Sequence, residues 1–492
     1  MQKRLWHPVP EAFCVFPQRK RLPSSFQRKA AAPFKNPTAH GLHLRRIAPI
    51  INMQKNSGGL EARQMAYEIK FIDYITKGED VRILVDRVEG RHPEHAHDFI
   101  EIVYIDAGLA LEYSGARAAV MLRKEFSVEK EIAEAYAYIC GLGFFELTVN
   151  GTLPDDSLLN PYITQYNKTV LYRTFDVTEL LKSGKNAIGV ELGNACYNEI
   201  GGVWNWQTAS WRDDPKLLMN LEIRYTDGSS ETVSTDTSWK VTNAGPTVSN
   251  SMYYGDTYDA RREQTGFSAA GFDDSAWETA AVAAAPEGEL RAQMKAPIKR
   301  VAEFKPAKIE KLKNGSYLVT APEMVAGWAK LSGINQAAGS KITLTYGQAL
   351  NEDGTVVKWG GPDGKTNHWW PHAYIQQDNY IAKGTGDESF EPKFSYKGHQ
   401  YIQIDGFEGE LTAENITIYR VSNGVDHIST FTSSNEMLNQ LHLMMQRAMA
   451  NNFQGEHCDP VLEKCGWLRD ANVSLGSLMY SYDMAASLPG WP

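Results

Sequence analysis

Residues 119–425 consist mainly of short segments in which apolar and polar residues alternate, with turn dipeptides between them. This pattern restricts the possible folds of the chain most strongly. This period of two is typical of antiparallel strands that place one face on a core. Three of the dipeptides are Asn150-Gly151, Asp227-Gly228 and Asn314-Gly315. They predict hairpin turns because both residues of each pair tolerate positive φ. Short strands with frequent turns favour β-sandwiches. We therefore predict a mainly β fold with two antiparallel, jelly-roll-like β-sandwich domains, over residues 119–285 and 296–425.

The hydrophobic period becomes helical from residue 430 onward. Ser433 and Glu436 have the spacing of a capping box at the start of a helical segment. Apolar residues then recur at helical intervals and predict a stripe that faces a core; they are Leu438, Leu441, Met445 and Ala448. Residues 430–492 are therefore expected to begin a helical domain.

Length, charge and cysteine content exclude several classes of protein. The 492 residues suffice for about three domains. A formal net charge of −9 gives no reason to expect nucleic acid or an anionic membrane as partner. No run approaches about 18 apolar residues, so we expect no transmembrane helix. The five cysteines are odd in number and scattered, which argues against a disulfide framework and favours a reducing, cytoplasmic location. We expect no zinc and no other cofactor from this composition.

The first 65 residues differ from the remainder. Residues 1–52 carry ten Lys or Arg and one acid, Glu11. They lack the continuous apolar stretch of a secretory signal. We interpret residues 1–65 as a basic, disordered tail without a fold of its own.

Residues 66–108 form a separate β segment. The run H-P-E-H-A-H-D-F-I-E-I-V-Y resembles the start of the cupin-like sensor domain of AraC-type transcription regulators. His95, His97 and Glu101 also match the first metal half-motif of cupins. The second half-motif is missing downstream, so we expect packed or solvated histidines and no metal. The segment is a partial cupin, either a fusion or an assembly artefact.

Carboxylates and a tryptophan gather between residues 455 and 472, in G-E-H-C-D-P-V-L-E-K-C-G-W-L-R-D-A-N. They are Glu456, Asp459, Glu463, Trp467 and Asp470. Acids beside an aromatic ring suit a sugar-cleaving site, because acids move protons and the ring packs on the sugar. The alternative is a solvated loop between two helices. A helix from about residue 466 to 484 would place Trp467 and Asp470 on one face of its first turn.

This stretch resembles the signature at the start of the catalytic domain of inverting α-L-rhamnosidases of the six-hairpin type, roughly D-x-P-x-x-E-[KR]-x-G-W-x-x-D-A. The matching residues are Pro460, Glu463, Lys464, Gly466, Trp467, Asp470 and Ala471. The resemblance implies that Glu463 is the general acid and that Asp470, Trp467 and Asp459 bind the rhamnose. Two positions depart from the pattern. Cys458 stands where the family has Asp, with Asp459 one residue later, and Leu462 stands where the family often has Arg.

Both predicted sandwiches resemble the same family. The first carries G-L-G-F-F-E-L-T-V-N-G, Y-R-T-F-D-V-T and L-G-N-A-C-Y-N. In some relatives this sandwich binds rhamnose through calcium near L-G-[ND]-G-W-Y, which makes Asn194 a candidate ligand, although Ala195 and Cys196 replace Gly-Trp. The alternative for Asn194 is a turn residue that bonds its own backbone. In the second sandwich, F-S-Y-K-G-H-Q-Y resembles F-x-Y-x-G-F-R-Y, with His399 and Gln400 in place of Phe-Arg.

The resemblance implies an α-L-rhamnosidase that hydrolyses terminal α-L-rhamnose from glycosides or polysaccharides with inversion. Its catalytic domain is an (α/α)6 barrel, of which residues 430–492 contain the first helices, and the family's general base lies further downstream. We therefore expect a truncated, inactive chain whose helices expose apolar faces. Two alternatives stay open, a non-catalytic carbohydrate-binding protein and a fragment of a sugar-sensing regulator. The aglycone and the oligomeric state are not predicted.

Overall fold

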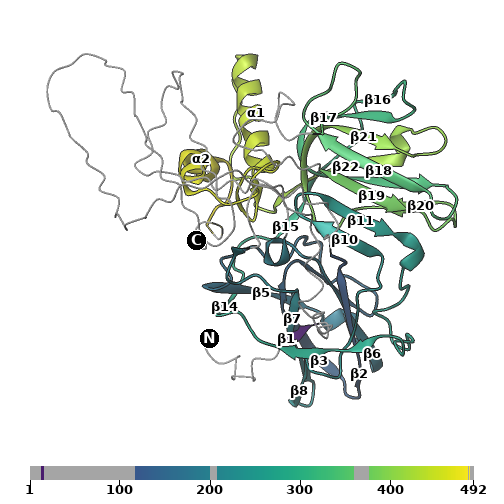
Figure 1. Cartoon of the computed structure of the whole chain (residues 1–492). Coiled ribbons are helices and arrows are strands. Elements are labelled where there is room, and N and C mark those ends of the chain that lie inside the picture. Colours follow the sequence, from purple (N-terminus) through teal and green to yellow (C-terminus); the bar gives the residue numbers. More distant parts are fainter. Residues whose placement is uncertain (1–12, 16–116, 200–207, 359–375, 486, 488–492) are drawn as a thin grey trace, which may run out of the picture. The chain divides into compact units, whose positions relative to one another are not determined.

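The computed structural model describes residues 13–15, 117–199, 208–358, 376–485 and 487 (Figure 1). The predicted cupin-like segment, with His95, His97 and Glu101, lies outside these ranges. Strands dominate the described chain, and two α-helices follow near its C-terminal end. The predicted mainly β fold is thus confirmed. Neither of the two described helices combines the length and apolarity needed to cross a membrane.

The first sandwich consists of two sheets. One has the order β13-β1-β7-β3-β5-β14, with β8 paired to β7, and the other has the order β12-β9-β2-β6-β4. The strands of the first sheet are β1 (Phe13–Val15), β3 (Ile132–Leu142), β5 (Thr169–Asp176), β7 (Lys216–Tyr225), β8 (Ser230–Ser234), β13 (Ala281–Ala283) and β14 (Glu289–Ala292). The strands of the second sheet are β2 (Val120–Val128), β4 (Phe145–Val149), β6 (Gly184–Leu192), β9 (Lys240–Thr242) and β12 (Glu278–Thr279).

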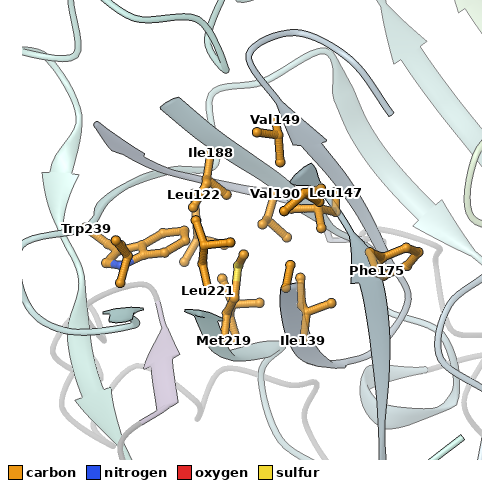
Figure 2. Close-up of a cluster of buried hydrophobic side chains, with 14 of the residues drawn as sticks. Leu122, Ile139, Leu147, Val149, Phe175, Ile188, Val190, Met219, Leu221 and Trp239 are labelled. Carbon is orange, nitrogen blue, oxygen red and sulfur yellow. The ribbon is translucent and has the colours of Figure 1, made fainter. Parts of the chain in front are cut away.

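The core of this sandwich lies between the two sheets (Figure 2). Leu122 of β2 and Val190 of β6 meet Ile139 of β3 and Leu221 of β7, and all four side chains are fully buried. Trp239 lies in the same cluster, and its indole N–H donates to the Ser234 carbonyl over 3.0 Å. Each strand therefore turns its apolar face inward, as the alternation predicts.

The glycines of the predicted turn dipeptides, together with Asn150, adopt left-handed backbone conformations. Asn150 and Gly151, after β4, have φ of 49° and 83°. Gly228, between β7 and β8, has φ of 82°, and Gly315, before β17, has φ of 91°. These are conformations that Asn and Gly adopt at little cost. The hairpin positions that the sequence predicts are confirmed.

One segment of the basic N-terminal tail is a strand, which corrects our expectation of no fold there. Phe13–Val15 form β1, which pairs antiparallel with β13 and contacts β7 at the register Cys14–Leu217. A sheet offers unpaired N–H and C=O groups along an exposed strand, and any extended segment can satisfy them. This pairing depends on the sheet edge more than on the composition of the tail.

The second β domain is built on a ten-stranded sheet in the order β10-β11-β19-β18-β21-β17-β22-β15, with β16 and β20 also paired to β17. Its strands are β10 (Thr247–Ser251), β11 (Gly255–Asp259), β15 (Ile298–Phe304), β16 (Lys308–Lys311), β17 (Tyr317–Ile334), β18 (Lys341–Gly347), β19 (Gln377–Ile381), β20 (Glu388–Phe390), β21 (Lys397–Asp405) and β22 (Ile416–Asn423). The long strand β17 pairs with β16, β20, β21 and β22.

The boundary between the two β domains differs from the predicted break near residue 285. The β10–β11 hairpin precedes that break, yet β11 pairs in parallel with β19 of the second domain. The Asp256 carboxylate accepts the backbone N–H groups of Lys393 and Phe394, at 2.7 and 2.9 Å. Lys393 in turn pairs with Glu146 and Glu191 of the first sandwich, at 2.6 and 2.8 Å. The two β domains are thus joined by partly buried polar contacts between residues far apart in sequence.

A third apolar cluster contains side chains from both domains. Phe394 and Tyr396 of the second domain pack there with Phe144, Tyr162 and Cys196 of the first. A Cβ atom at Gly193 would overlap the Phe394 ring, so the absence of a side chain at 193 admits that ring. Of the two rings of the F-S-Y-K-G-H-Q-Y run that we expect in the core, Tyr396 is buried and Tyr401 is only partly buried.

Two helices, α1 (Glu436–Asn451) and α2 (Leu468–Ser481), follow β22. The N-cap of α1 is Asn435, whose side chain accepts the Met437 N–H at 3.0 Å. Ser433 therefore does not cap the helix as the capping-box spacing suggested. Its hydroxyl accepts the Asn435 N–H instead.

The apolar stripe of α1 is exposed, which corrects its assignment as a core face. Leu438, Leu441 and Met445 are 45%, 49% and 55% exposed. The buried residues of α1 are Met449 and Asn451, at its C-terminal end. The stripe lacks a partner within the part of the chain that the structure describes, so the exposed apolar faces predicted for these helices are confirmed.

Candidate active site

The segment that carries the candidate site is anchored to β22. Its two-stranded hairpin is formed by β23 (Phe453–Gln454) and β24 (Glu456–His457), with Gly455 at φ 90° between them. Ser422 donates to the Phe453 carbonyl over 2.9 Å, and Gln454 donates its side-chain N–H to the Val421 carbonyl over 2.8 Å. These bonds fix the chain just before the signature residues 458–467.

Asp459 shapes the turn that carries Glu463. Its carboxylate accepts the backbone N–H groups of Val461, Leu462 and Glu463, the last at 2.7 Å. Three amides on one carboxylate resemble the anion site at a helix N-terminus and hold the turn closed. The Asp459 carboxylate therefore contacts its own turn, and its predicted role in sugar binding stays a prediction.

Glu463 is held from both its backbone and its side chain. The Tyr253 hydroxyl donates to the Glu463 carbonyl over 2.8 Å. The Trp467 indole N–H donates to the Glu463 carboxylate. Trp467 is the N-cap residue of α2 and is 38% exposed, so one part of its ring is open to a ligand. The structure thus brings the predicted acid and the predicted sugar-stacking ring into direct contact.

Asp470 lies in the first turn of α2 and is exposed. Its negative charge counteracts the effect of burial on His457, which lowers the pKa of that imidazole. The Ser474 hydroxyl lies 3.1 Å from the His457 Nε2 atom and stabilises the ring position. Trp467 and Asp470 thus both lie at the start of α2, which begins two residues later than the predicted helix.

Lys464 ties the signature to the second β domain. It is buried, with a left-handed φ of 50°, and its ammonium group donates to the carbonyls of Met252 and Tyr396. The same group lies 4.4 Å from the centre of the Tyr396 ring, a cation–π contact. Burial, with the nearby positive charge of Lys397, lowers the pKa of Lys464 to about 7. Lys464 thus has a positioning role that the sequence pattern does not reveal.

The position that the family pattern reserves for Asp is a buried thiol here. The Cys458 Sγ atom lies 3.7 Å from the Tyr396 hydroxyl and 3.7 Å from the Gln454 side-chain oxygen. Burial raises the pKa of Cys458 to about 12, so the thiol stays neutral. No negative charge is therefore placed at residue 458, and the Asp459 carboxylate one residue later is bound to its own turn.

Asn194 lies in the first sandwich with every side-chain hydrogen-bonding group occupied. Its amide N–H groups donate to the carbonyls of Arg117 and Asn250, both at 3.0 Å, and its oxygen accepts from Asn198 at 3.0 Å. Within the described ranges, no group of three or more His, Cys, Asp or Glu side chains is arranged to hold a metal. The role of Asn194 in sugar or calcium binding stays a prediction.

Sequence reasoning missed two residues that position the site. Tyr253 lies more than two hundred residues before Glu463, and nothing in its local pattern marks it. Gly398 does match the family pattern, but its purpose becomes visible only in the fold. A Cβ at Gly398 would overlap Val461 and approach Pro460 to 3.3 Å, so the signature turn packs directly on this glycine.

Comparison with known proteins assigns the same three regions. The sequence matches the alpha-L-rhamnosidase N-terminal domain over residues 130–302. It matches the bacterial alpha-L-rhamnosidase concanavalin-like domain over residues 310–422. It matches the bacterial alpha-L-rhamnosidase 6 hairpin glycosidase domain over residues 426–492.

Individual relatives agree with these matches. An alpha-L-rhamnosidase of Formosa agariphila is 34% identical over 380 residues, which are 75% of this chain and 38% of that protein. The structure of an alpha-L-rhamnosidase from Dictyoglumus thermophilum is 35% identical with a TM-score of 0.68, over 75% of this chain and 40% of that one. The Streptomyces avermitilis enzyme complexed with L-rhamnose is 30% identical with a TM-score of 0.70, over 76% and 36%. The chain thus spans well under half the length of these relatives.

Proposed function

Since the chain belongs to the bacterial α-L-rhamnosidase family, within glycoside hydrolase family 78, we propose that its signature turn is the acid half of a site that hydrolyses terminal α-L-rhamnosides with inversion. Glu463 is the proton donor. The observation that carries this proposal is the contact of the Glu463 carboxylate with the Trp467 indole on a turn fixed by Asp459 and Tyr253. A catalytic acid must be held within hydrogen-bonding reach of the atom that it protonates, and its pKa is considered only once that geometry is met.

The proposed step begins with rhamnose lying against the exposed part of Trp467, with Asp470 hydrogen-bonded to its hydroxyls. Glu463 transfers its proton to the glycosidic oxygen as the bond from that oxygen to the anomeric carbon breaks. A water molecule attacks the anomeric carbon from the opposite face and loses its proton to a base. The acid and the base of inverting enzymes are separated by roughly 6.5–9.5 Å to admit that water.

The general base is proposed to come from outside the signature segment. Asp459 is occupied by three backbone amides, which removes it from this role. Glu456 lines a cavity to which Glu463 does not contribute. The six-hairpin match comprises residues 426–492 of this chain, and we assign the base to the part of such a domain that follows this region in the relatives. The 492-residue chain is then expected to bind rhamnosides without turnover.

Incubation of the 492-residue chain with 4-nitrophenyl α-L-rhamnopyranoside tests this assignment. We expect no release of nitrophenol. If nitrophenol is released and Glu463→Gln abolishes the release, the general base lies within this chain and its assignment to a later part of the domain is overturned. Release that Glu463→Gln leaves unchanged would also overturn Glu463 as the acid. In a relative's full-length scaffold that carries this signature segment, Glu463→Gln should lower kcat by at least about a hundredfold.

Binding of L-rhamnose tests the substrate class independently of turnover. The complex of the Streptomyces avermitilis relative with L-rhamnose supports this choice of sugar. In calorimetry with the 492-residue chain, Trp467→Ala and Asp470→Asn should each weaken rhamnose binding about tenfold. The matched control is Asn243→Asp, an exposed position on the first sandwich. Equal affinity in all variants would contradict the proposed contacts.

The alternative function is carbohydrate binding without catalysis, which the two fully formed β cores permit. Rhamnose binding without rhamnoside hydrolysis, in this chain and in the full-length scaffold alike, would favour it.

We also propose a reducing, cytoplasmic location. Four cysteines of the described ranges are free thiols, and three of these are buried; the four are Cys140, Cys196, Cys458 and Cys465. This arrangement supports the proposal because oxidising compartments favour paired cysteines. Cell fractionation of the native host, with an antibody against the chain, tests it.

A further inference from the structure

A cavity of about 240 Å³ lies where the two β domains meet the signature segment. The first sandwich contributes Tyr162, Gln165 and Trp211 to its lining, and the signature segment contributes Glu456 and Lys464. Neither Glu463 nor Trp467 lines it. The cavity is therefore separate from the site proposed for rhamnose, although the same turn borders both.

Most polar groups of this lining are already engaged. The Lys464 ammonium donates to two backbone carbonyls, and the Gln454 amide donates to the Val421 carbonyl. Thr164 donates its hydroxyl to the Thr169 carbonyl over 2.5 Å. These groups complete the protein's own hydrogen bonds and offer little to a ligand.

Glu456 differs from these groups. Across the described part of the chain, no donor is hydrogen-bonded to its carboxyl group, and the side chain is only partly exposed. A Cβ at Gly466 would overlap this carboxyl group, so the bare glycine leaves it room. Burial raises the pKa of Glu456, and the Lys295 charge opposes this only in part. Because Glu456 is partly exposed and lines the cavity, the hydrogen-bond partner of its carboxyl group has to come from the cavity.

The remaining lining is aromatic and apolar, which narrows the class of ligand. Tyr162, Trp211 and Tyr396 contribute rings, and Phe144 and Ile298 contribute apolar surface. A sugar would bring several hydroxyls, most of which would find no partner here. A cavity of about 150 Å³ already accepts benzene, so this larger one has room for a ring with one or two substituents.

We propose that this cavity binds a monocyclic phenol, with its ring among Tyr162, Trp211 and Tyr396 and its hydroxyl hydrogen-bonded to Glu456. Gln165 is an exposed residue of the same lining, so the ligand enters beside it. This site goes beyond the proposed hydrolysis and does not depend on it.

Calorimetric titration of the 492-residue chain with p-cresol and with toluene at pH 6 tests the proposal. The two probes share a ring and a methyl group, and only p-cresol carries a hydroxyl. We expect one p-cresol site per chain. Glu456→Leu should weaken p-cresol about tenfold, the value of one hydrogen bond, and leave toluene within twofold. Glu456→Gln, which keeps a polar group, should retain p-cresol within threefold.

The matched control is Glu410→Leu, the same substitution at an exposed position, which should change neither affinity. Thermal melting confirms that each variant is folded. Absence of p-cresol binding at millimolar concentration, or equal affinity in wild type and Glu456→Leu, would overturn the site. Saturating L-rhamnose should leave p-cresol binding unchanged. Competition between L-rhamnose and p-cresol would place the phenol at the sugar site and refute a separate cavity. If p-cresol binds and L-rhamnose does not, the result contradicts the proposed hydrolysis and leaves the phenol site intact.

Discussion

At the scale of single residues, the second β domain contains a fully buried histidine. His399 has no exposed surface, and its Nε2 atom has no hydrogen-bond partner among the residues that the structure describes. Its ring meets Tyr346 edge to face, with 5.0 Å between ring centres. Burial lowers the pKa of His399 to about 4. The family pattern has Phe here, a ring that could keep the contact with Tyr346 without an unsatisfied nitrogen.

We therefore predict that His399→Phe stabilises the chain by about 1 kcal/mol at pH 8. The gain should be larger at pH 5. Between the unfolded pKa of 6.5 and the folded pKa of about 4, the unfolded chain binds a proton that the native chain does not, so native stability falls as the pH drops. Urea denaturation at both pH values measures this. His427→Phe, at an exposed position, should keep the wild-type acid sensitivity. An equal gain at both pH values would contradict a neutral buried His399.

At the scale of elements, the signature turn depends on the strand against which it packs. Gly398 of β21 lies under Val461 and Pro460, while Lys464 and Tyr253 hold the other end of the turn. These contacts lie on both sides of the turn, so its geometry depends on them. Disturbing the strand should therefore loosen the catalytic turn without any change in the signature.

Gly398→Ala should destabilise the chain by about 1–3 kcal/mol, because the added methyl group overlaps Val461. Hydrogen exchange of residues 459–466 should become faster than in the wild type. Gly476→Ala is the matched control. No atom lies within 4 Å of a Cβ built at Gly476 inside α2, so this substitution should stabilise by about 0.5–1 kcal/mol. Unchanged exchange in Gly398→Ala would show that the turn does not depend on β21.

At the scale of the whole molecule, the exposed apolar faces of α1 and α2 govern the behaviour of the chain in solution. Met437 and Met444 of α1 are 70% and 60% exposed, and Val473 and Tyr480 of α2 are 78% and 80% exposed. Large apolar side chains exposed to this degree favour association. The two β domains, by contrast, have closed cores joined by the ion pairs of Lys393.

We predict that the 492-residue chain self-associates at micromolar concentration and that Met437→Glu with Met444→Glu reduces this association. Light scattering measures the effect, and the melting temperature should change little, because both side chains are already in water. Thr237→Glu with Asn243→Glu adds the same charge at exposed positions of the first sandwich and should not reduce association. Equal association of both double variants would exclude the helix faces as its cause.

The sequence alone determined the features that depend on near neighbours. Asn150-Gly151 turns because those residues accept left-handed backbone, and the alternation of β3 and β7 selects their buried faces. The signature itself identified the segment that holds Glu463 and Trp467. Only the tertiary structure decided what those residues contact. The bonds from Tyr253 and Lys464 join positions more than two hundred residues apart. Three other features also depend on which surfaces are available to pack: the cap of α1, the crossing of β11 into the second sheet and the exposure of the α1 stripe. A local sequence pattern does not specify such distant partners.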